Sequence, residues 1–322
     1  MKINDRIYGL QEINEKILIE LINSKSVQRL KDISQLGMPD EYYHLPGFSR
    51  YEHSLGVMIL LKNLGARLKE QIAGLLHDVS HPPFSHVIDW AIGDPTKEDY
   101  QDKIHEGFLK SSEIPNILQE HGFDVKSISD YKNFKLLEKQ PPSLCADRLD
   151  YSLREISMQK GKPFVEKILE DLFVKENQIV FRNEDIAKIF GEEYMRLQKE
   201  HWGGDEARSR YYILSNVLNK AFKDSLIGLE DLKKNEEYIL RILNNSGDEF
   251  ILNGLNLLKR GFRVVGDTNG IELKKKFRYV DPEVVVNETY YPLSKISREY
   301  SNLIDLEKKK NMEINKVRIV PN

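Results

Sequence analysis

The spacing of hydrophobic residues over the first half of the chain is that of amphipathic helices. Apolar side chains recur every three or four positions in residues 17–33, 50–68 and 69–79, which predicts a helix over each segment. Residues 38–50 contain two prolines and a glycine, and the motif SHPPFSH at 80–86 contains two more prolines, so both are expected to be loops. The chain up to about residue 170 is therefore predicted to be mostly helical.

A short departure from this pattern follows. Residues 172–181, with the sequence LFVKENQIVF, place two apolar stretches on either side of Glu176-Asn177 and predict a small hairpin. The helical period then returns over residues 190–261.

The composition changes again after Gly261. The segment FRVVGDTNGIEL predicts a second hairpin around Asn269-Gly270. The segments RYVDPEVVV and NKVRIV predict further strands, and REYSNLIDLEKK predicts a helix between them. We therefore expect a mainly α fold with a core over residues 1–190, a helical extension over 191–261 and a smaller α+β lobe over 262–322.

Composition and charge narrow the class of protein. Of the 322 residues, 40% are hydrophobic and 31% are charged, which suits a globular protein with a buried core. The formal net charge of −3 argues against a general binder of nucleic acids or anionic membranes. No apolar signal peptide is visible and the longest apolar run, VMILL, is too short to span a bilayer, so we expect a cytoplasmic protein. The single cysteine, Cys145, fits a reducing compartment and is expected to be buried.

Candidate metal ligands occur at three places in the helical core. The doublet His77-Asp78 ends an apolar segment, His53 lies upstream in YEHSLGV, and Asp147 lies downstream in CADRLDY. Two imidazoles and two carboxylates suit a divalent cation that holds both a water and a phosphate oxygen. Adjacent side chains on a helix point about 100° apart, so both members of the doublet reach one cation only near a helix end. A His-Asp doublet by itself is more often a structural polar pair, and its neighbours decide the interpretation.

Two groups close to these residues favour a catalytic site. His81, His86 and Asp89 follow the doublet closely, in a chain with only eight histidines. Arg50 precedes His53 by three positions, and a guanidinium group binds phosphate oxygens in a forked geometry. Both groups point to chemistry on a phosphate.

A third group lies on the segment that carries Asp147. Asp147, Tyr151 and Glu155 are spaced four residues apart and share one helix face, with Arg148 beside them. A metal ligand, a phenol and a carboxylate on one face are typical of a pocket wall, and Arg148 is placed to hold a second phosphate.

These segments together resemble a known family. The order of His53, His77-Asp78 and Asp147 is that of the HD-superfamily phosphohydrolases. The motifs RYEHSLGV, HDVSHPPFSH and ADRLDY are most similar to those of the deoxynucleoside triphosphate triphosphohydrolases, including the vertebrate enzyme that joins a sterile-alpha-motif domain to an HD domain. The resemblance is strong from Val27 to Glu155 and weaker beyond, and it implies a helical HD-domain bundle for the core.

The resemblance also implies a role for each matched residue. Arg50 would hold the α-phosphate, Leu36 would fill the space that a 2′-hydroxyl needs, and Tyr151 would lie under the sugar. The complete set comprises the metal ligands His53, His77, Asp78 and Asp147, the catalytic polar cluster His81, His86, Asp89 and His105, and the substrate contacts Gln35, Leu36, Arg50, Arg148, Tyr151 and Glu155.

The implied activity is hydrolysis of a dNTP to a deoxynucleoside and inorganic triphosphate, by attack of a metal-activated water on the α-phosphorus with His86 as the acid for the 5′-oxygen. The ligands admit Mn, Fe, Ni, Mg or Zn, and His81 with His86 leave a second metal possible. The family also suggests a homo-oligomer. Three alternatives stay open. The first is an HD phosphohydrolase that acts on a monophosphate, on a cyclic or dinucleotide ester, or on a nucleic-acid end. The second is a non-catalytic nucleotide sensor, and the third is an oxygenase with two irons.

Several other residues carry weaker signals. His44, His121 and His201 are isolated in the sequence and are predicted to lie at the surface or at helix caps. The basic segment Lys274–Lys276 with Arg278 is predicted to be a solvated edge, with a site for an anionic effector as the alternative. The helix that carries Arg208, Arg210, Tyr211 and Tyr212 is expected near the pocket, where these residues either meet the β- and γ-phosphates or have ordinary surface and core roles.

Overall fold

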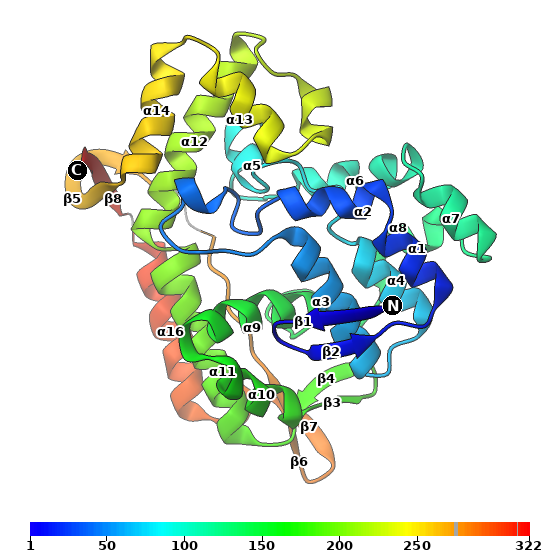
Figure 1. Cartoon of the computed structure of the whole chain (residues 1–322). Coiled ribbons are helices and arrows are strands. Elements are labelled where there is room, and N and C mark those ends of the chain that lie inside the picture. The colour runs from blue at the N-terminus through cyan, green and yellow to red at the C-terminus, as the bar shows by residue number, and fades with distance from the viewer. Residues whose placement is uncertain (274–275, 314) are drawn as a thin grey trace.

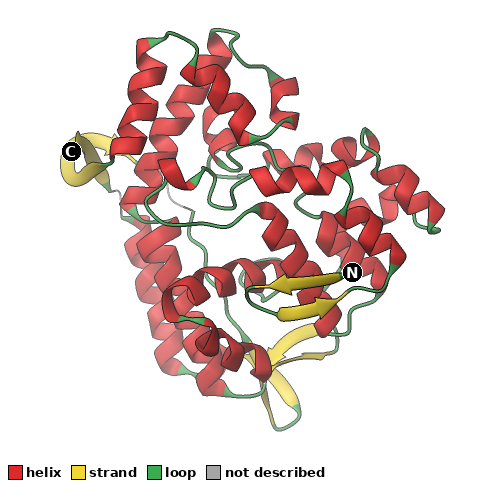
Figure 2. Cartoon of the chain, viewed as in Figure 1, coloured by secondary structure: helices red, strands yellow, loops and turns green. Residues whose placement is uncertain are grey.

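Helices make up most of the chain in a computed structural model that describes residues 1–273, 276–313 and 315–322. Figures 1 and 2 show the helices gathered around the centre of the molecule, with short strands at its periphery. The mainly α fold with a sheet-containing C-terminal lobe is confirmed.

The helices predicted for the first half of the chain are present. The first predicted helix is divided in two, because Ser24 accepts a hydrogen bond from the backbone N–H of Val27 and begins a new helix. In chain order these helices are α1 (Lys16–Ile22), α2 (Lys25–Arg29), α3 (Arg50–Asn63), α4 (Leu68–Leu76), α5 (Val87–Ile92), α6 (Tyr100–Lys110), α7 (Ile114–Glu120), α8 (Val125–Ser129), α9 (Ala146–Lys160) and α10 (Lys162–Asp171).

Helix α3 is the central helix of the larger hydrophobic core, and it packs against α4 and α9. Two glycines allow the close approach. A Cβ on Gly56 would lie 2.1 Å from Oδ1 of Asp150 on α9, and a Cβ on Gly74 would lie 2.4 Å from Cδ1 of Leu61. The three helices that carry the candidate metal ligands are thus brought together by small residues at their crossings.

A second hydrophobic core lies beside the first and is formed mainly by α5 and the helices that follow residue 204. Its residues include Val87, Leu214 and Leu255. The helices of the second half are α11 (Glu184–Leu197), α12 (Asp205–Lys223), α13 (Glu236–Asn244), α14 (Glu249–Arg260), α15 (Leu293–Ile296) and α16 (Arg298–Met312), with a π-helical turn over Gln198–Trp202.

Short strands flank the helical body. The predicted hairpin is confirmed as β3 (Leu172–Lys175) and β4 (Gln178–Phe181), and Glu176 and Asn177 at its turn have left-handed φ values of 51° and 60°. Strand β4 also pairs in parallel with β6 (Glu283–Val286), which forms a hairpin with β7 (Thr289–Pro292). The N-terminal residues, for which no element was predicted from the sequence, form a further hairpin of β1 (Lys2–Asp5) and β2 (Gly9–Glu12).

The second predicted hairpin is wrong. Residues 262–272 form one strand, β5 (Phe262–Glu272), which pairs antiparallel with β8 (Lys316–Pro321). Gly266 and Ile271 both pair with Val317, so the residues between them bulge out of the ladder and the Asn269-Gly270 dipeptide does not reverse the chain. Side chains of β5 and β8 pack against the second core, which explains why β5 takes a partner from the end of the chain.

Residues 262–322 contact both cores. Phe262 on β5 belongs to the second core, whereas Val284 on β6 and Tyr300 on α16 belong to the first. The division of the chain at residues 190 and 261 stays a prediction.

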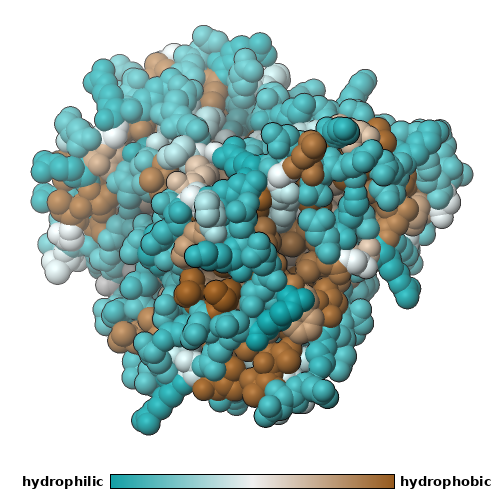
Figure 3. Space-filling view, turned by 60° about the horizontal axis from the view of Figure 1, so that its bottom comes forward, coloured by the Kyte–Doolittle hydropathy of each residue, from teal (hydrophilic) through white to brown (hydrophobic). Residues whose placement is uncertain are grey.

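The surface is mainly polar. Figure 3 shows hydrophobic side chains as separate brown patches on a largely hydrophilic face. Among the described residues, no helix combines the length and apolar character needed to span a bilayer.

Candidate active site

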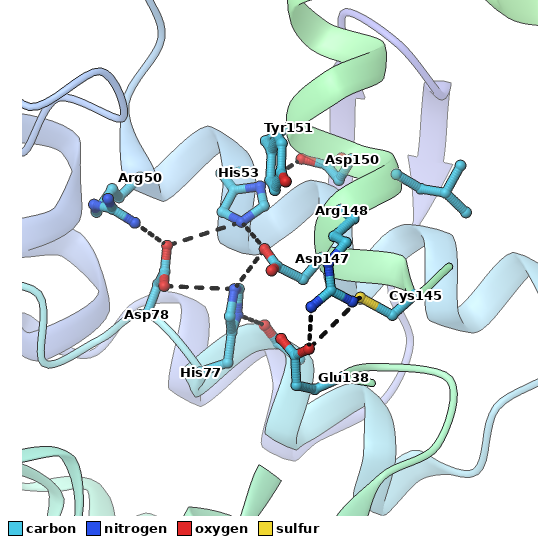
Figure 4. Close-up of polar contacts among 12 residues, drawn as sticks. Arg50, His53, His77, Asp78, Glu138, Cys145, Asp147, Arg148, Asp150 and Tyr151 are labelled. Carbon is cyan, nitrogen blue, oxygen red and sulfur yellow. Dashed lines mark hydrogen bonds and ion pairs between the residues drawn. The ribbon is translucent and has the colours of Figure 1, made fainter. Parts of the chain in front are cut away.

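Four polar side chains from three helices converge at the centre of the molecule (Figure 4). His53 comes from α3, Asp147 from the first turn of α9, and His77 with Asp78 from the end of α4, where His77 is the C-cap residue. Nε2 of His53 lies 3.0 Å from Oδ1 of Asp147, and Nε2 of His77 lies 3.5 Å from that same oxygen and 3.5 Å from Oδ1 of Asp78. The helix end at His77 therefore lets both members of the doublet face one point.

The ring nitrogens that face this point are available as ligands. Nδ1 of His77 donates to the carbonyl oxygen of Gly74 at 2.7 Å, and Nδ1 of His53 donates to a carboxylate at 2.8 Å. With Nδ1 of each ring engaged as a donor, Nε2 is the nitrogen at which a metal ion can take the place of a proton. Nε2 of His77 is buried and has no hydrogen-bond partner among the described residues, as expected of a metal ligand.

The electric field at the cluster favours a cation. Burial alone lowers the pKa of His77, but the carboxylates of Asp78 and Asp147 outweigh burial and raise the pKa to about 9. Burial raises the pKa of Asp78, but the charges of Arg50 and His77 hold it well below its usual range. The ligand atoms of His53, His77 and Asp147 lie within 4.8 Å of one another, which fits one divalent ion.

A second layer of polar groups orients His53. The carboxylate that accepts from its Nδ1 belongs to Asp150, which also accepts from Nε of Arg154 at 2.8 Å and from the hydroxyl of Tyr8 at 2.8 Å. Arg154 is fully buried and also binds Asp5 at 2.8 Å. Sequence reasoning missed Asp150, although its position three residues after Asp147 on the same helix is a signal for it.

Arg50 lies directly beside the cluster. Its Nη1 binds Oδ2 of Asp78 at 2.5 Å, and its Nε donates to Oγ of Ser85 at 2.8 Å. The side chain is 3% exposed. Two fixed partners hold the guanidinium in one orientation at the edge of the cluster.

The turn after the doublet brings two of the predicted polar residues next to the cluster. Nε2 of His81 lies 3.4 Å from Oδ1 of Asp78, and burial together with Arg50 lowers the pKa of His81 to about 3, so its imidazole is neutral. His86 packs edge-on against His81 and its Nδ1 lies 3.4 Å from Oδ2 of Asp89. Asp89 is in turn fixed by the backbone N–H of Tyr100 at 2.9 Å.

His105 lies further back. It is hydrogen-bonded to Oγ of Ser80 at 2.8 Å and packs against the ring of Tyr131. Burial, followed by the charge of His77, lowers its pKa to about 4. It does not line the cleft described below, whereas its partner Tyr131 does, so the geometry gives it a supporting position.

The predicted sugar side of the site is built around Tyr151 and Glu155. The hydroxyl of Tyr151 is hydrogen-bonded to that of Tyr194. Glu155 accepts from Nδ1 of His201 at 2.6 Å and from Nε1 of Trp202 at 2.7 Å. Nε2 of His201 then accepts from the hydroxyl of Tyr43 at 2.9 Å. The prediction that His201 lies at the surface or at a helix cap is wrong, because its side chain is 4% exposed and the residue lies within the π-helical turn Gln198–Trp202.

Arg148 lies on α9 next to Asp147. Its Nη2 binds Glu138 at 2.9 Å and its Nη1 contacts Sγ of Cys145 at 2.9 Å (Figure 4). Cys145 is buried as predicted, and burial followed by the charge of Glu138 raises the pKa of its thiol. The guanidinium of Arg148 is therefore already paired with the carboxylate of Glu138.

Of the site residues predicted from the sequence, all except His53, Asp89 and His105 line one cleft of about 540 Å³. Its lining includes Gln35 and Leu36, and also the cations Arg208, Lys276 and Arg278. The predicted solvated edge is thus wrong for Lys276 and Arg278, which line the cleft, and Lys274 and Lys275 lie outside the described residues. Both cationic and anionic side chains line it.

Comparison with known proteins agrees with this geometry. The HD domain family model matches residues 50–155, which contain all four candidate metal ligands. The chain is 36% identical to the uncharacterized protein YdhJ of Bacillus subtilis over 308 residues, which cover 93% of each chain. It is 35% identical to the metal-dependent phosphohydrolase cns2 of Cordyceps militaris over 68% of this chain and 65% of that protein.

The chain belongs to the HD-domain family of metal-dependent phosphohydrolases. Over a shorter stretch, this HD phosphohydrolase is 42% identical to the deoxynucleoside triphosphate triphosphohydrolase SAMHD1 of Bos taurus, covering 27% of this chain and 17% of that protein. A phosphohydrolase from Bacteroides thetaiotaomicron has the same fold, with a TM-score of 0.72 and 18% identity over 100% of this chain and 99% of that one. HD phosphohydrolases bind divalent metal ions, and the His/Asp cluster of this HD domain fits such an ion.

Proposed function

We propose that this HD phosphohydrolase converts dNTPs to deoxynucleosides and inorganic triphosphate. One observation carries the proposal: among the described residues, eight lysine and arginine side chains line the cleft, together with seven aspartate and glutamate side chains of which two, Asp78 and Asp147, are proposed metal ligands. Such a density of cations suits a substrate with several phosphates better than a monophosphate. The match to SAMHD1 over the HD domain supports the same substrate class.

The proposed ligands of the cation are His53, His77, Asp78 and Asp147. When bound, the cation lowers the pKa of a water molecule and holds a phosphate oxygen. Arg50 is placed to neutralise charge that develops on the α-phosphate, because Asp78 and Ser85 fix its guanidinium before the substrate arrives.

The leaving oxygen needs a proton donor. His86 is 32% exposed and packs against His81 beside the cluster, and its Nδ1 is directed at Asp89. With one proton engaged by that carboxylate, the proton on Nε2 is the one that His86 delivers to the 5′-oxygen. His105 supports the turn through Ser80 and touches no substrate atom in this arrangement.

The sugar is proposed to lie between Leu36 and Tyr151. Both line the cleft, and Leu36 is 8% exposed, so it presents an apolar surface where a 2′-hydroxyl would require a polar partner. Glu155 does not face the sugar with a free carboxylate, because His201 and Trp202 occupy it. Its proposed role is to fix these two rings at the end of the cleft.

A second candidate is an HD phosphohydrolase that acts on a different nucleotide phosphoester. The longer match to the metal-dependent phosphohydrolase cns2 supports metal-dependent phosphohydrolysis without specifying a dNTP. The deciding experiment is turnover of all dNTPs, NTPs and nucleoside monophosphates with several divalent metals, with triphosphate, pyrophosphate and phosphate resolved. Triphosphate from dNTPs supports the first function, whereas phosphate released only from monophosphates supports the second. The family resemblance also predicts a homo-oligomer, which light scattering will test.

A further inference from the structure

Glu98 is a buried carboxylate surrounded by cations. It lies in the loop between α5 and α6, and its side chain is 1% exposed. It forms an ion pair with Arg278, and Nζ of Lys276 lies 3.7 Å from one of its oxygens. Nη1 of Arg208 lies 3.8 Å from the other. Three positive side chains therefore face one negative charge.

These three cations belong to the wall of the active-site cleft. Arg208 comes from α12, and Lys276 and Arg278 come from the segment between β5 and β6. Other contacts help to hold them: the guanidinium of Arg208 lies 4.4 Å from the ring centroid of Trp90, and Gln198 donates to the carbonyl oxygen of Lys276 at 3.0 Å. Arg208 and Lys276 are therefore held in the cleft partly by contacts that do not involve Glu98.

The backbone at Glu98 is strained. Its φ is +53°, in the left-handed region that residues with a side chain seldom adopt. The loop is tied to Asp94, whose carboxylate accepts from Thr96 at 2.9 Å and whose carbonyl accepts from the N–H of Glu98 at 3.0 Å. A strained residue that persists in a cleft wall is held there by its surroundings, here by the three cations.

The local charge balance also favours a stronger anion. Burial alone raises the pKa of Glu98, but Arg278, His86 and the other nearby cations outweigh burial and lower the pKa to about 2. One carboxylate leaves this group of cations with a net positive charge. A terminal phosphate group carries more charge and more acceptor oxygens than a carboxylate.

We propose that Arg208, Lys276 and Arg278 form the subsite for the distal phosphates of a nucleoside polyphosphate, and that Glu98 occupies this subsite until the substrate displaces it. The identity of the substrate rests on the proposed function, whereas the anion subsite and its occupant rest on the contacts above. The loop of residues 93–99 then moves away when a triphosphate enters, and its backbone relaxes.

Calorimetric binding of inorganic tripolyphosphate and of orthophosphate to the metal-loaded protein tests the subsite. Glu98→Gln keeps the shape of the side chain and removes its charge, so the variant should bind tripolyphosphate about tenfold more tightly because the competing state is lost. Arg278→Gln should bind it about tenfold more weakly. Glu230→Gln, which removes one charge from a side chain that is 84% exposed, is the matched control and should leave binding unchanged. Orthophosphate, which does not reach from the metal to the subsite, should respond weakly to all three changes.

Thermal unfolding gives an independent measure if Arg278→Gln folds poorly. Tripolyphosphate should raise the midpoint of Glu98→Gln by more than that of the wild type, and Lys276→Gln should show the smallest rise. If Glu98→Gln binds tripolyphosphate no more tightly than the wild type, Glu98 is a structural tie between the loop and the C-terminal segment, and the proposal is overturned.

Failure of the proposed function is visible separately. A wild-type enzyme that releases no triphosphate from any dNTP contradicts that function, yet the calorimetric comparison of the variants is unaffected. Conversely, triphosphate release with no response of tripolyphosphate binding to Glu98→Gln or Arg278→Gln overturns the subsite alone.

Discussion

Nδ1 of His53 lies 2.8 Å from Oδ2 of Asp150, on the side of the imidazole that faces away from the other metal ligands. This contact determines which ring nitrogen carries the proton, and it leaves Nε2 free at the centre of the site. The carboxylate is itself held by Arg154 and Tyr8, so the orientation of a proposed metal ligand depends on residues outside the proposed ligand set.

Asp150→Asn should weaken metal binding without removing a ligand. An amide presents an N–H where Asp150 now accepts from His53, Arg154 and Tyr8, so the imidazole loses its fixed tautomer. We expect the affinity for the divalent ion to fall by about 10- to 100-fold, measured by competition with a chelator. Activity should return at high metal concentration, whereas Asp147→Asn, which alters a proposed ligand, should not be rescued. Unchanged metal affinity in Asp150→Asn would contradict this role.

Arg50→Lys should lower kcat more than it changes KM. A lysine cannot bind Asp78 and Ser85 at once and still present a fixed donor to the phosphate. Loss of one preorganised donor predicts a fall in kcat of about 100-fold, measured by steady-state kinetics with saturating metal. Ser85→Ala removes only the contact to Nε and should have a smaller effect. An equal effect of both changes would count against a direct contact of Arg50 with the substrate.

Leu36→Ala should relax discrimination against ribonucleotides. The substitution opens space in the cleft wall where Leu36 is 8% exposed. We expect the ratio of kcat/KM for an NTP to that for the matching dNTP to rise by about tenfold. Because the ratio is measured within one variant, general damage to the enzyme lowers both kcat/KM values and leaves their ratio unchanged. An unchanged ratio in Leu36→Ala would rule out the proposed role.

Gly56→Ala should destabilise the protein strongly. Its Cβ would lie 2.0 Å from Nη2 of Arg154 and 2.1 Å from Oδ1 of Asp150, and both side chains are fully buried. We expect the free energy of unfolding to fall by about 3 kcal/mol, together with a loss of metal affinity. Gly107→Ala on α6 is the matched control, because nothing lies within 4 Å of its Cβ, and it should stabilise the protein by about 0.5–1 kcal/mol. Urea denaturation of both variants checks the pair.

Glu236 should give stability an unusual dependence on pH. Burial raises its pKa to about 7, although Ser34 and the N–H of Phe84 donate to the carboxylate. The folded state therefore binds this proton more tightly than the unfolded state, so the contribution of Glu236 to stability is full below about pH 4.5 and declines as pH rises to about 7.

The comparison with Glu236→Gln isolates this effect, because other titrating groups are the same in both proteins. Between pH 4.5 and 8 the free energy of unfolding of the wild type should fall relative to the variant by about 3 kcal/mol. A difference that does not vary with pH would show that Glu236 is ionised in the folded protein throughout this range.

Local patterns in the sequence predicted much of the fold. The helices α3, α4 and α9 and the hairpin β3–β4 follow from apolar periodicity and turn residues, which act over a few positions of the chain. The position of His77 at the end of α4 followed from the prolines after it. The strand β5 was misread because its partner, β8, is separated from it by more than forty residues.

By itself, the sequence determined which residue types stand at the ends and faces of helices, and hence the His53, His77, Asp78 and Asp147 set. Only the tertiary structure decided what surrounds that set. The contact of Asp150 with His53, the chain from Glu155 through His201 to Tyr43, and the cations around Glu98 each join distant segments. Such contacts arise from the packing of one helix or loop on another, and a local sequence pattern does not predict which distant segments pack together.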